Sequence, residues 1–126
     1  MTGSAAYARM RAALYERLAA LAPGELVRLD ALAAALNIPS RHAASILARI
    51  APEEQDLHPW WRVIPAAACF PVTARRTARQ HAQIALLAKD GVAISADGSI
   101  GDLEKRLIIP DMRDAGRVWL EPDGTP

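Results

Sequence analysis

Hydrophobic side chains recur every three or four residues in the first part of the chain, which is the spacing of one face of an α-helix. The residues of this stripe are Met10, Leu14, Leu18 and Leu21. We expect a helix that is capped by Ser4 and runs to about Ala22, because Pro23-Gly24 then breaks the pattern.

Two shorter helices follow on either side of a tight turn. The first starts near Asp30 and turns Leu32, Ala33 and Leu36 inward. Asn37-Ile38-Pro39 forms the turn, and Ser40 is the expected N-cap of the next helix, which ends before Pro52. Two short helices joined in this way predict a helix-turn-helix.

The second helix of this pair has a thin polar face that suits contact with DNA. Its buried stripe is expected to be Ala43, Ile46, Leu47 and Ile50. The opposite, exposed side carries Ser40, Arg41, His42, Ser45 and Arg49. Small residues in its middle allow close approach to a DNA groove, and the unpaired N–H groups of its first turn favour a phosphate.

The rest of the chain contains one further helix. A polar loop at 53–58 leads into Pro59-Trp60-Trp61-Arg62-Val63-Ile64-Pro65, where the two flanking prolines predict an extended segment. A helix is expected from about Ala74 to Ala88, with a C-cap at 89–91, and a small hairpin at 92–101. From Asp102 onward we expect an irregular, loose tail.

These elements predict a mainly α, winged-helix-like helix-turn-helix domain with a small β hairpin over residues 4–101, followed by an acidic C-terminal extension over 102–126. Ten Arg and Lys residues oppose six Asp and Glu up to residue 81, whereas five oppose eight from residue 82 onward. A basic front and an acidic tail fit a protein that presents one face to nucleic acid. The preference for Arg over Lys also has a bland explanation, a GC-rich genome.

Several functional classes are excluded by absent features. The one cysteine, Cys69, cannot form an internal disulfide, so we expect a reducing cytoplasmic location. It is expected to be a small buried residue rather than a nucleophile. His42, His58 and His81 lack metal-ligand spacing, no glycine-rich phosphate loop is present, and no apolar run could span a membrane, so neither cofactor, metal nor membrane is predicted.

The stretch from about Tyr7 to Gly101 resembles the DNA-binding domain of O6-alkylguanine-DNA alkyltransferases. Those enzymes carry a Pro-Cys-His-Arg-Val motif whose cysteine takes the alkyl group from the base. Here Pro59-Trp60-Trp61-Arg62-Val63 stands at the matching place, after the same helix-turn-helix. Alkyltransferase-like proteins are the branch in which Trp replaces that cysteine, and the chain resembles this branch.

The replacement removes the chemistry of alkyl transfer. Dealkylation needs a thiolate to attack the alkyl carbon, whereas an indole offers only one N–H donor. The histidine that helps to take the thiol proton in the family is Trp61 here. Nucleophile and base are both absent, so the resemblance implies damage recognition without an enzymatic reaction.

The resemblance also implies roles for individual residues. Arg41 would be the finger that fills the stack when the damaged base rotates out of the duplex through the minor groove. Trp60 would line the alkyl pocket, with Trp61 partly structural, although both tryptophans could simply be core. Arg62 would have a structural role or contact a phosphate, and Arg75 or Arg76 would reach the flipped base, contact a phosphate or stay solvated.

The chain departs from the family at the second helix. A tyrosine that presses on the phosphate to start flipping is commonly found there, and Leu29 or Arg28 occupies its place. Arg28 could grip that phosphate but could not press on it in the same way. The chain also lacks the family's asparagines before and after the motif, with Pro65 in the later position.

Three functional hypotheses follow. The first is a monomeric sensor that binds duplex DNA containing O6-alkylguanine and flags it for nucleotide excision repair proteins. The second is a winged-helix transcriptional regulator that reads DNA by sequence, which the helix-turn-helix and hairpin would fit. The third is an active alkyltransferase or other enzyme that uses Cys69.

Overall fold

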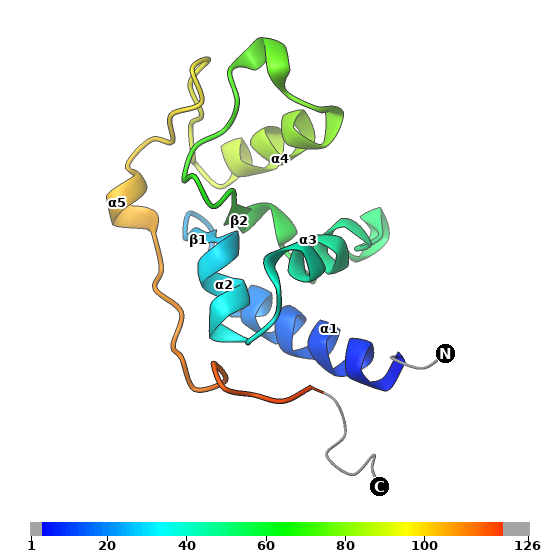
Figure 1. The fold of residues 1–126 in the computed structure, drawn as a ribbon. Coiled ribbons are helices and arrows are strands. Elements are labelled where there is room, and N and C mark those ends of the chain that lie inside the picture. The colour runs from blue at the N-terminus through cyan, green and yellow to red at the C-terminus, as the bar shows by residue number, and fades with distance from the viewer. Residues whose placement is uncertain (1–3, 120–126) are drawn as a thin grey trace, which may run out of the picture.

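The computed structural model describes residues 4–119, which form a mainly α-helical molecule with a very small sheet (Figure 1). The helices and strands are α1 (Ser4–Ala19), β1 (Val27–Arg28), α2 (Leu29–Ala35), α3 (Ser40–Ala48), β2 (Val63–Ile64), α4 (Ala78–Lys89) and α5 (Leu103–Arg106). Single 3-10 turns lie at Pro52–Glu54, Trp60–Arg62 and Thr73–Arg75. The expected mainly α class with a minor β element is therefore confirmed.

Helix α1 supports the helix-turn-helix through its apolar stripe. Leu14 and Leu18 are fully buried and Leu21 nearly so, whereas Met10 is partly exposed. Ser4 is already part of the helix, and the residues before it lie outside the described residues. The helix ends at Ala19, before the predicted Ala22, because a tighter turn follows and leads to Gly24 at a φ of +91°.

The helix-turn-helix is present as predicted. Helices α2 and α3 are joined by a turn in which Asn37 takes a left-handed φ of +54°. The four positions expected to be buried on α3, Ala43, Ile46, Leu47 and Ile50, are all buried. Ser40 is not the N-cap, however: it is the first helical residue, Pro39 precedes the helix, and no side chain caps it.

The segment from Pro59 to Pro65 is only partly extended, which corrects the prediction. Trp60–Arg62 forms a 3-10 turn, closed by a hydrogen bond from the backbone N–H of Arg62 to the carbonyl of Pro59. Val63–Ile64 then forms β2, which pairs in parallel with β1 in the register Val27 to Val63. This pairing holds the tryptophan turn beside the start of α2.

The predicted hairpin at 92–101 is reduced to one antiparallel bridge, between Ile94 and Ile100. Its turn packs closely on the neighbouring loop, since a Cβ at Gly98 would lie 1.8 Å from the carbonyl oxygen of Phe70. Only glycine fits there, and its φ of +96° also favours glycine. The wing is thus a packed turn instead of a projecting hairpin.

Helix α4 begins at Ala78, four residues later than predicted. Thr77 and Gln80 form a capping box: the N–H of Gln80 donates to the Thr77 hydroxyl and the N–H of Thr77 donates to the Gln80 side chain. The C-cap at Asp90 followed by Gly91 agrees with the prediction.

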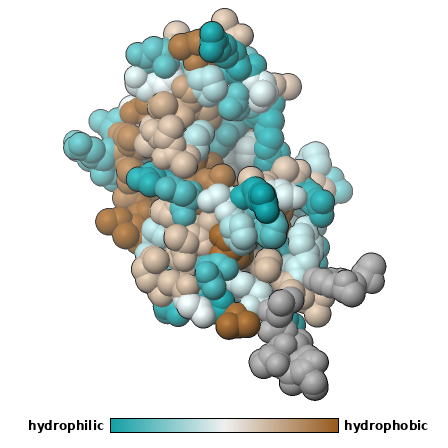
Figure 2. Space-filling view, viewed as in Figure 1, coloured by the Kyte–Doolittle hydropathy of each residue, from teal (hydrophilic) through white to brown (hydrophobic). Residues whose placement is uncertain are grey.

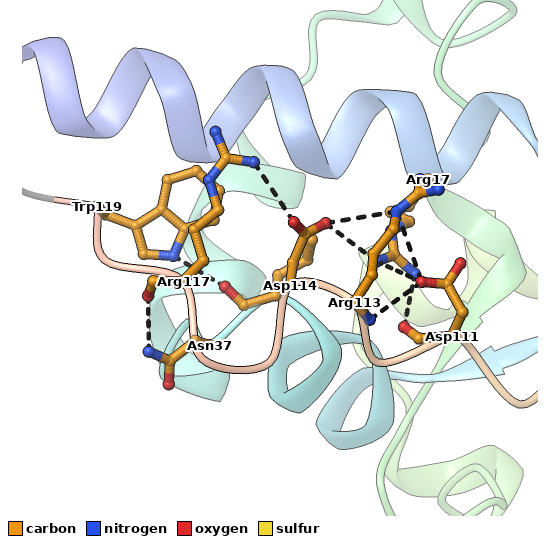
Figure 3. Close-up of polar contacts among 8 residues, drawn as sticks. Arg17, Asn37, Asp111, Arg113, Asp114, Arg117 and Trp119 are labelled. Carbon is orange, nitrogen blue, oxygen red and sulfur yellow. Dashed lines mark hydrogen bonds and ion pairs between the residues drawn. The ribbon is translucent and has the colours of Figure 1, made fainter.

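Residues 107–119, which follow α5, do not form a loose tail, which corrects another expectation. Residues 107–119, which we call the strap, run along α1 and α2 (Figures 1 and 3). Leu26, beside β1, donates to the carbonyl of Arg106 and accepts from the N–H of Ile108, and it thereby forms a parallel bridge with Leu107. Arg17 of α1 pairs with Asp111 and Asp114. Ile108 and Ile109, which follow α5, are exposed apolar residues. Figure 2 shows apolar surface on the left of the molecule, the side on which α5 lies in Figure 1.

The far end of the strap is anchored by Trp119, which is 5% exposed. Its indole N–H donates to the carbonyl of Leu36 at 2.8 Å, and the side chain of Asn37 donates to the carbonyl of Arg117 at 2.8 Å (Figure 3). Arg9 of α1 bonds to the carbonyl of Trp119 itself. The strap therefore ties α1 to the turn that precedes α3.

Replacing Trp119 tests this anchoring. We expect Trp119→Ala to lower the free energy of unfolding by roughly 3 kcal/mol, because a buried indole is lost. Trp119→Phe, which keeps an aromatic ring and loses the N–H donor, is expected to cost about 1 kcal/mol. Val118→Ala is the matched control, since Val118 is 73% exposed. Urea unfolding curves in which all three variants match the parent would show that the strap does not contribute to stability.

Candidate nucleic-acid interface

The exposed face of α3 carries the residues that the sequence predicted. Arg41, His42, Ser45 and Arg49 are all exposed, together with Ser40 and Ala44. The helix contains no acidic residue, and within residues 4–119 no carboxylate pairs with Arg41. The face is therefore narrow, positively charged and built on small side chains.

A pocket of about 220 Å³ opens beside α3, on the side that faces α4. It is smaller than the range of roughly 300–1,000 Å³ that is usual for drug-sized ligands, so a ligand there would be no larger than about a single base. The residues that line it are Leu29, Ala44, Leu47, Trp60, Val63, Ile64, Pro65, Arg79 and Gln83. Most of this lining is apolar, and the charged exception is Arg79.

Trp60 and Arg79 form a stacked pair in this pocket. The guanidinium carbon of Arg79 lies 3.9 Å from the centroid of the Trp60 ring, which is a close cation–π contact. Arg79 also donates to the carbonyl of Leu47 in α3 at 3.2 Å. Desolvation lowers the pKa of Arg79, yet a guanidinium stays charged at neutral pH. The pocket therefore combines a flat apolar surface with a fixed positive charge.

Trp61 and Arg62 do not line the pocket; they hold the tryptophan turn in place. Arg62 makes a forked pair with Asp90, with bonds of 2.8 and 3.1 Å, and donates to the carbonyl of Leu21 at 2.9 Å. The indole N–H of Trp61 donates to the same Asp90 carboxylate at 2.9 Å. Of the two roles expected for Arg62, the structural one is observed, because its donors are already used inside the protein.

Asp90 is the acceptor at the centre of this arrangement. Burial by itself would raise the pKa of Asp90, but the hydrogen bonds from Arg62 and Trp61 and the charge of Arg62 outweigh it, so the pKa lies below its ordinary value. Asp90 is thus ionised at neutral pH and can keep both donors satisfied.

Gln83 connects the same turn to α4 from the pocket side. It is a buried polar residue, 8% exposed, and its amide donates to the carbonyls of Trp61 at 3.1 Å and Val63 at 2.8 Å. Pro59 is buried at the start of the turn and does not reach the pocket. The sequence predicts seven residues for the lesion pocket, and Trp60 and Val63 are the two that line it. The seven are Pro59, Trp60, Trp61, Arg62, Val63, Arg75 and Arg76.

Neither Arg75 nor Arg76 lines the pocket. Both precede α4, because the helix starts later than expected. Arg76 donates to the carbonyls of Pro71 and Ser95, and so ties the loop to the turn at 95–99. Arg75 is exposed on the 3-10 turn.

Arg79 is the residue that sequence reasoning missed. The Thr77-x-x-Gln80 capping box could have found it, because a helix start at Ala78 places Arg79 and Gln83 one turn apart on one face. The predicted start at Ala74 hid this signal.

The two candidates for the tyrosine position differ in what they contact. Arg28 pairs with Asp30 at 2.6 Å, and the hydrogen bond to Arg28 lowers the pKa of that carboxyl. Leu29, in contrast, lines the pocket. Arg28 is thus committed to a local pair, and an apolar side chain stands next to the base-sized space.

The cysteine and the histidines lie outside the lining of the pocket. Cys69 is exposed, which corrects the prediction that it is buried, and it does not line the pocket. His58 stacks on Tyr15 at a centroid distance of 3.9 Å. Among residues 4–119, no three His, Cys, Asp or Glu side chains group as metal ligands would, and no helix has the length and apolarity to cross a membrane.

These features define a helix-turn-helix domain with a tryptophan-lined pocket beside its second helix. No family model and no curated protein match the sequence. The fold matches that of the S. pombe alkyltransferase-like protein Atl1 in two solved structures. One contains damaged DNA with O6-carboxymethylguanine, and the other is a complex with DNA. Each match has a TM-score of 0.64 at 18% identity and covers 82% of this chain and 97% of that one. The chain has the alkyltransferase-like fold.

Neutralising Asp90 tests the lock on the tryptophan turn. We expect Asp90→Asn to cost roughly 3 kcal/mol of stability at pH 7, because Arg62 is left as an unpaired buried charge. The pKa of Asp90 is lowered in the folded state, so its contribution is present above the ordinary pKa and is lost as the pH falls through the folded value.

The gap between the parent and Asp90→Asn should therefore narrow below about pH 4. Urea unfolding at several pH values measures this gap, and Glu104→Gln, which alters an exposed carboxylate on α5, is the control. A gap that stays constant from pH 7 to pH 3 would contradict the lock.

Proposed function

We propose that this protein is an alkyltransferase-like DNA damage sensor, which binds O6-alkylguanine in duplex DNA and leaves the alkyl group in place. The observation that carries the proposal is the position of Trp60. Its indole stands in a pocket beside the exposed face of a DNA-binding helix, in the sequence position where alkyltransferases have their acceptor cysteine. The shared fold with Atl1 supports the proposal.

The pocket does not offer a nucleophile for alkyl transfer. Its described lining contains no thiol, and Trp61, in the place of the family's histidine, has its N–H committed to Asp90. Cys69 lies outside the lining, on the surface. Binding without dealkylation is the outcome that these side chains favour.

The exposed face of α3 suits insertion into the minor groove. Ala44 and Ser45 keep the helix surface low, and Arg41, in its first turn, forms no ion pair with any residue of 4–119. In the proposed complex, Arg41 occupies the space that the extruded guanine leaves in the stack. Unstacking costs a few kcal/mol, which a weakly paired damaged base reduces.

The extruded base would enter the Trp60 pocket. An alkylated guanine has a flat ring and an apolar substituent, and the pocket offers an indole, aliphatic side chains and the Arg79 guanidinium. Leu29, one of the two candidates for the position of the family's tyrosine, is part of the apolar wall of the pocket. With either candidate at that position, we expect flipping to depend on capture of the base more than on a push against the phosphate.

Two finer points belong to the same proposal. The bound lesion would be flagged for nucleotide excision repair proteins, and the protein would act as a monomer. The competing hypothesis of a winged-helix regulator is weaker, because the wing that such a protein inserts beside its helix is here a turn packed on the loop at Phe70.

The proposal is tested by comparing two matched duplexes, one with and one without a single O6-methylguanine. We expect tighter binding to the damaged duplex and no increase in protein mass after prolonged incubation with it. Fluorescence anisotropy measures the affinities and mass spectrometry detects transferred methyl. Equal affinity for both duplexes would exclude damage sensing, and a mass gain of one methyl group would exclude a non-enzymatic role.

Arg79→Ala separates lesion capture from general DNA binding. We expect the variant to lose roughly two- to fivefold in affinity for the damaged duplex, since Arg79 is exposed and a cation–π contact at an exposed site is worth roughly 0.5–1 kcal/mol. Its affinity for undamaged DNA should change far less. Lys89→Ala removes a positive charge at the other end of the same helix and serves as the control. If the ratio of the affinities for the damaged and the undamaged duplex is unchanged in Arg79→Ala, Arg79 does not contribute to lesion capture.

A further inference from the structure

A second hollow lies on the opposite flank of α3 from the Trp60 pocket. It has a volume of about 360 Å³ and lies between α3 and the first half of α1. We call it the α1–α3 groove, and its lining is Ala6, Tyr7, Met10, His42, Ser45, Ile46 and Arg49. The sequence does not predict this groove, because the pattern of α1 indicates only a helix that packs against the helix-turn-helix.

The groove has an apolar floor, and Arg49 belongs to its lining. Arg11 is not part of the lining but lies next to the groove, near the ring of Tyr7. The guanidinium carbons of Arg11 and Arg49 lie 5.6 and 5.8 Å from the centroid of the Tyr7 ring. Both arginines are exposed, and no carboxylate among residues 4–119 forms an ion pair with either of them. Cation–π contacts therefore orient two charges whose hydrogen-bond donors remain available to a ligand.

The position of α3 between the two hollows indicates which ligand the α1–α3 groove binds. Ala44 and Leu47, three residues apart, face the Trp60 pocket. His42, Ser45 and Arg49, spaced at three and four residues, face the α1–α3 groove. In Figure 1, α3 accordingly lies between α4 and α1.

A helix that enters a groove of duplex DNA has one sugar–phosphate backbone on each side. In the proposed complex, the strand that carries the damaged base lies on the side of the Trp60 pocket. The α1–α3 groove then faces the other strand, whose phosphates are the natural partners of unpaired guanidinium groups.

We propose that the α1–α3 groove binds the sugar–phosphate backbone of the undamaged strand. Arg11 and Arg49 contact phosphate oxygens, and Tyr7 with the apolar floor packs against deoxyribose. This inference rests on the proposed DNA-binding function, and it adds α1 to a surface that was otherwise limited to α3 and the Trp60 pocket. Gripping the opposite strand holds the duplex while one base leaves it.

The salt dependence of DNA binding tests this assignment. Loss of one phosphate contact lowers the slope of log affinity against log salt concentration by about 0.9 on duplex DNA. We expect this decrease for Arg11→Ala on damaged and undamaged duplexes alike, with the ratio of their affinities unchanged. Lys105→Ala, which removes an exposed charge on α5, is the control and should keep the parent slope.

The DNA strand that the groove contacts is identified by replacing phosphates with uncharged methylphosphonate linkages in one strand at a time. The linkages are placed opposite the lesion in the undamaged strand or beside the lesion in the damaged strand. The parent should lose affinity when the undamaged strand is modified, and Arg11→Ala should be insensitive to the same linkage. If Arg11→Ala shows the same slope of log affinity against log salt concentration as the parent protein, the groove does not bind phosphate. Sensitivity to the damaged strand alone would overturn the strand assignment.

These outcomes are separate from those of the proposed function. Damage sensing is judged by the affinity ratio of the parent protein for the two duplexes. The groove is judged by the slope, which is measured on undamaged DNA as well. A parent protein with no preference for the lesion but a reduced slope in Arg11→Ala would retain the groove and reject the sensor.

Discussion

The ion pair between Arg62 and Asp90 holds the candidate site together. It joins the tryptophan turn to the end of α4, and the bond from Arg62 to the carbonyl of Leu21 adds the end of α1. A carboxylate at a helix C-terminus opposes the helix dipole. Arg62 and the Trp61 indole offset this cost, so the docked turn stabilises the Asp90 carboxylate and the carboxylate accepts from both donors of the turn.

This lock explains why two adjacent tryptophans have different environments. In a 3-10 turn, successive side chains point in different directions, and the two indole rings are nearly perpendicular, at 87°. Trp61 points to Asp90 and is structural, whereas Trp60 points to the pocket and stacks with Arg79. The rigid placement of one ring therefore depends on the buried hydrogen bond of the other.

The strap fixes the turn before α3, and one hollow lies on each flank of the helix. Trp119 bonds to the end of α2 and Asn37 bonds to the strap, so the turn before α3 is held from the side of α1. The exposed face of α3 then lies between an apolar pocket and a groove that Arg49 lines and Arg11 adjoins. Neither arginine forms an ion pair within residues 4–119, and the proposed binding of both DNA backbones and one displaced base rests on this arrangement.

The sequence alone determined the helix-turn-helix, the exposed face of α3 and the loss of the acceptor thiol, because helical periodicity and the identity of Trp60 are local properties. The resemblance was carried by a five-residue motif, and the Atl1 fold agrees with it. Tertiary structure alone decided that Arg79 reaches Trp60, that Arg62 and Trp61 share Asp90, and that the strap docks through Trp119. Each of these contacts joins residues far apart in the chain or depends on where a helix begins, and neither hydrophobic spacing nor composition records such distances.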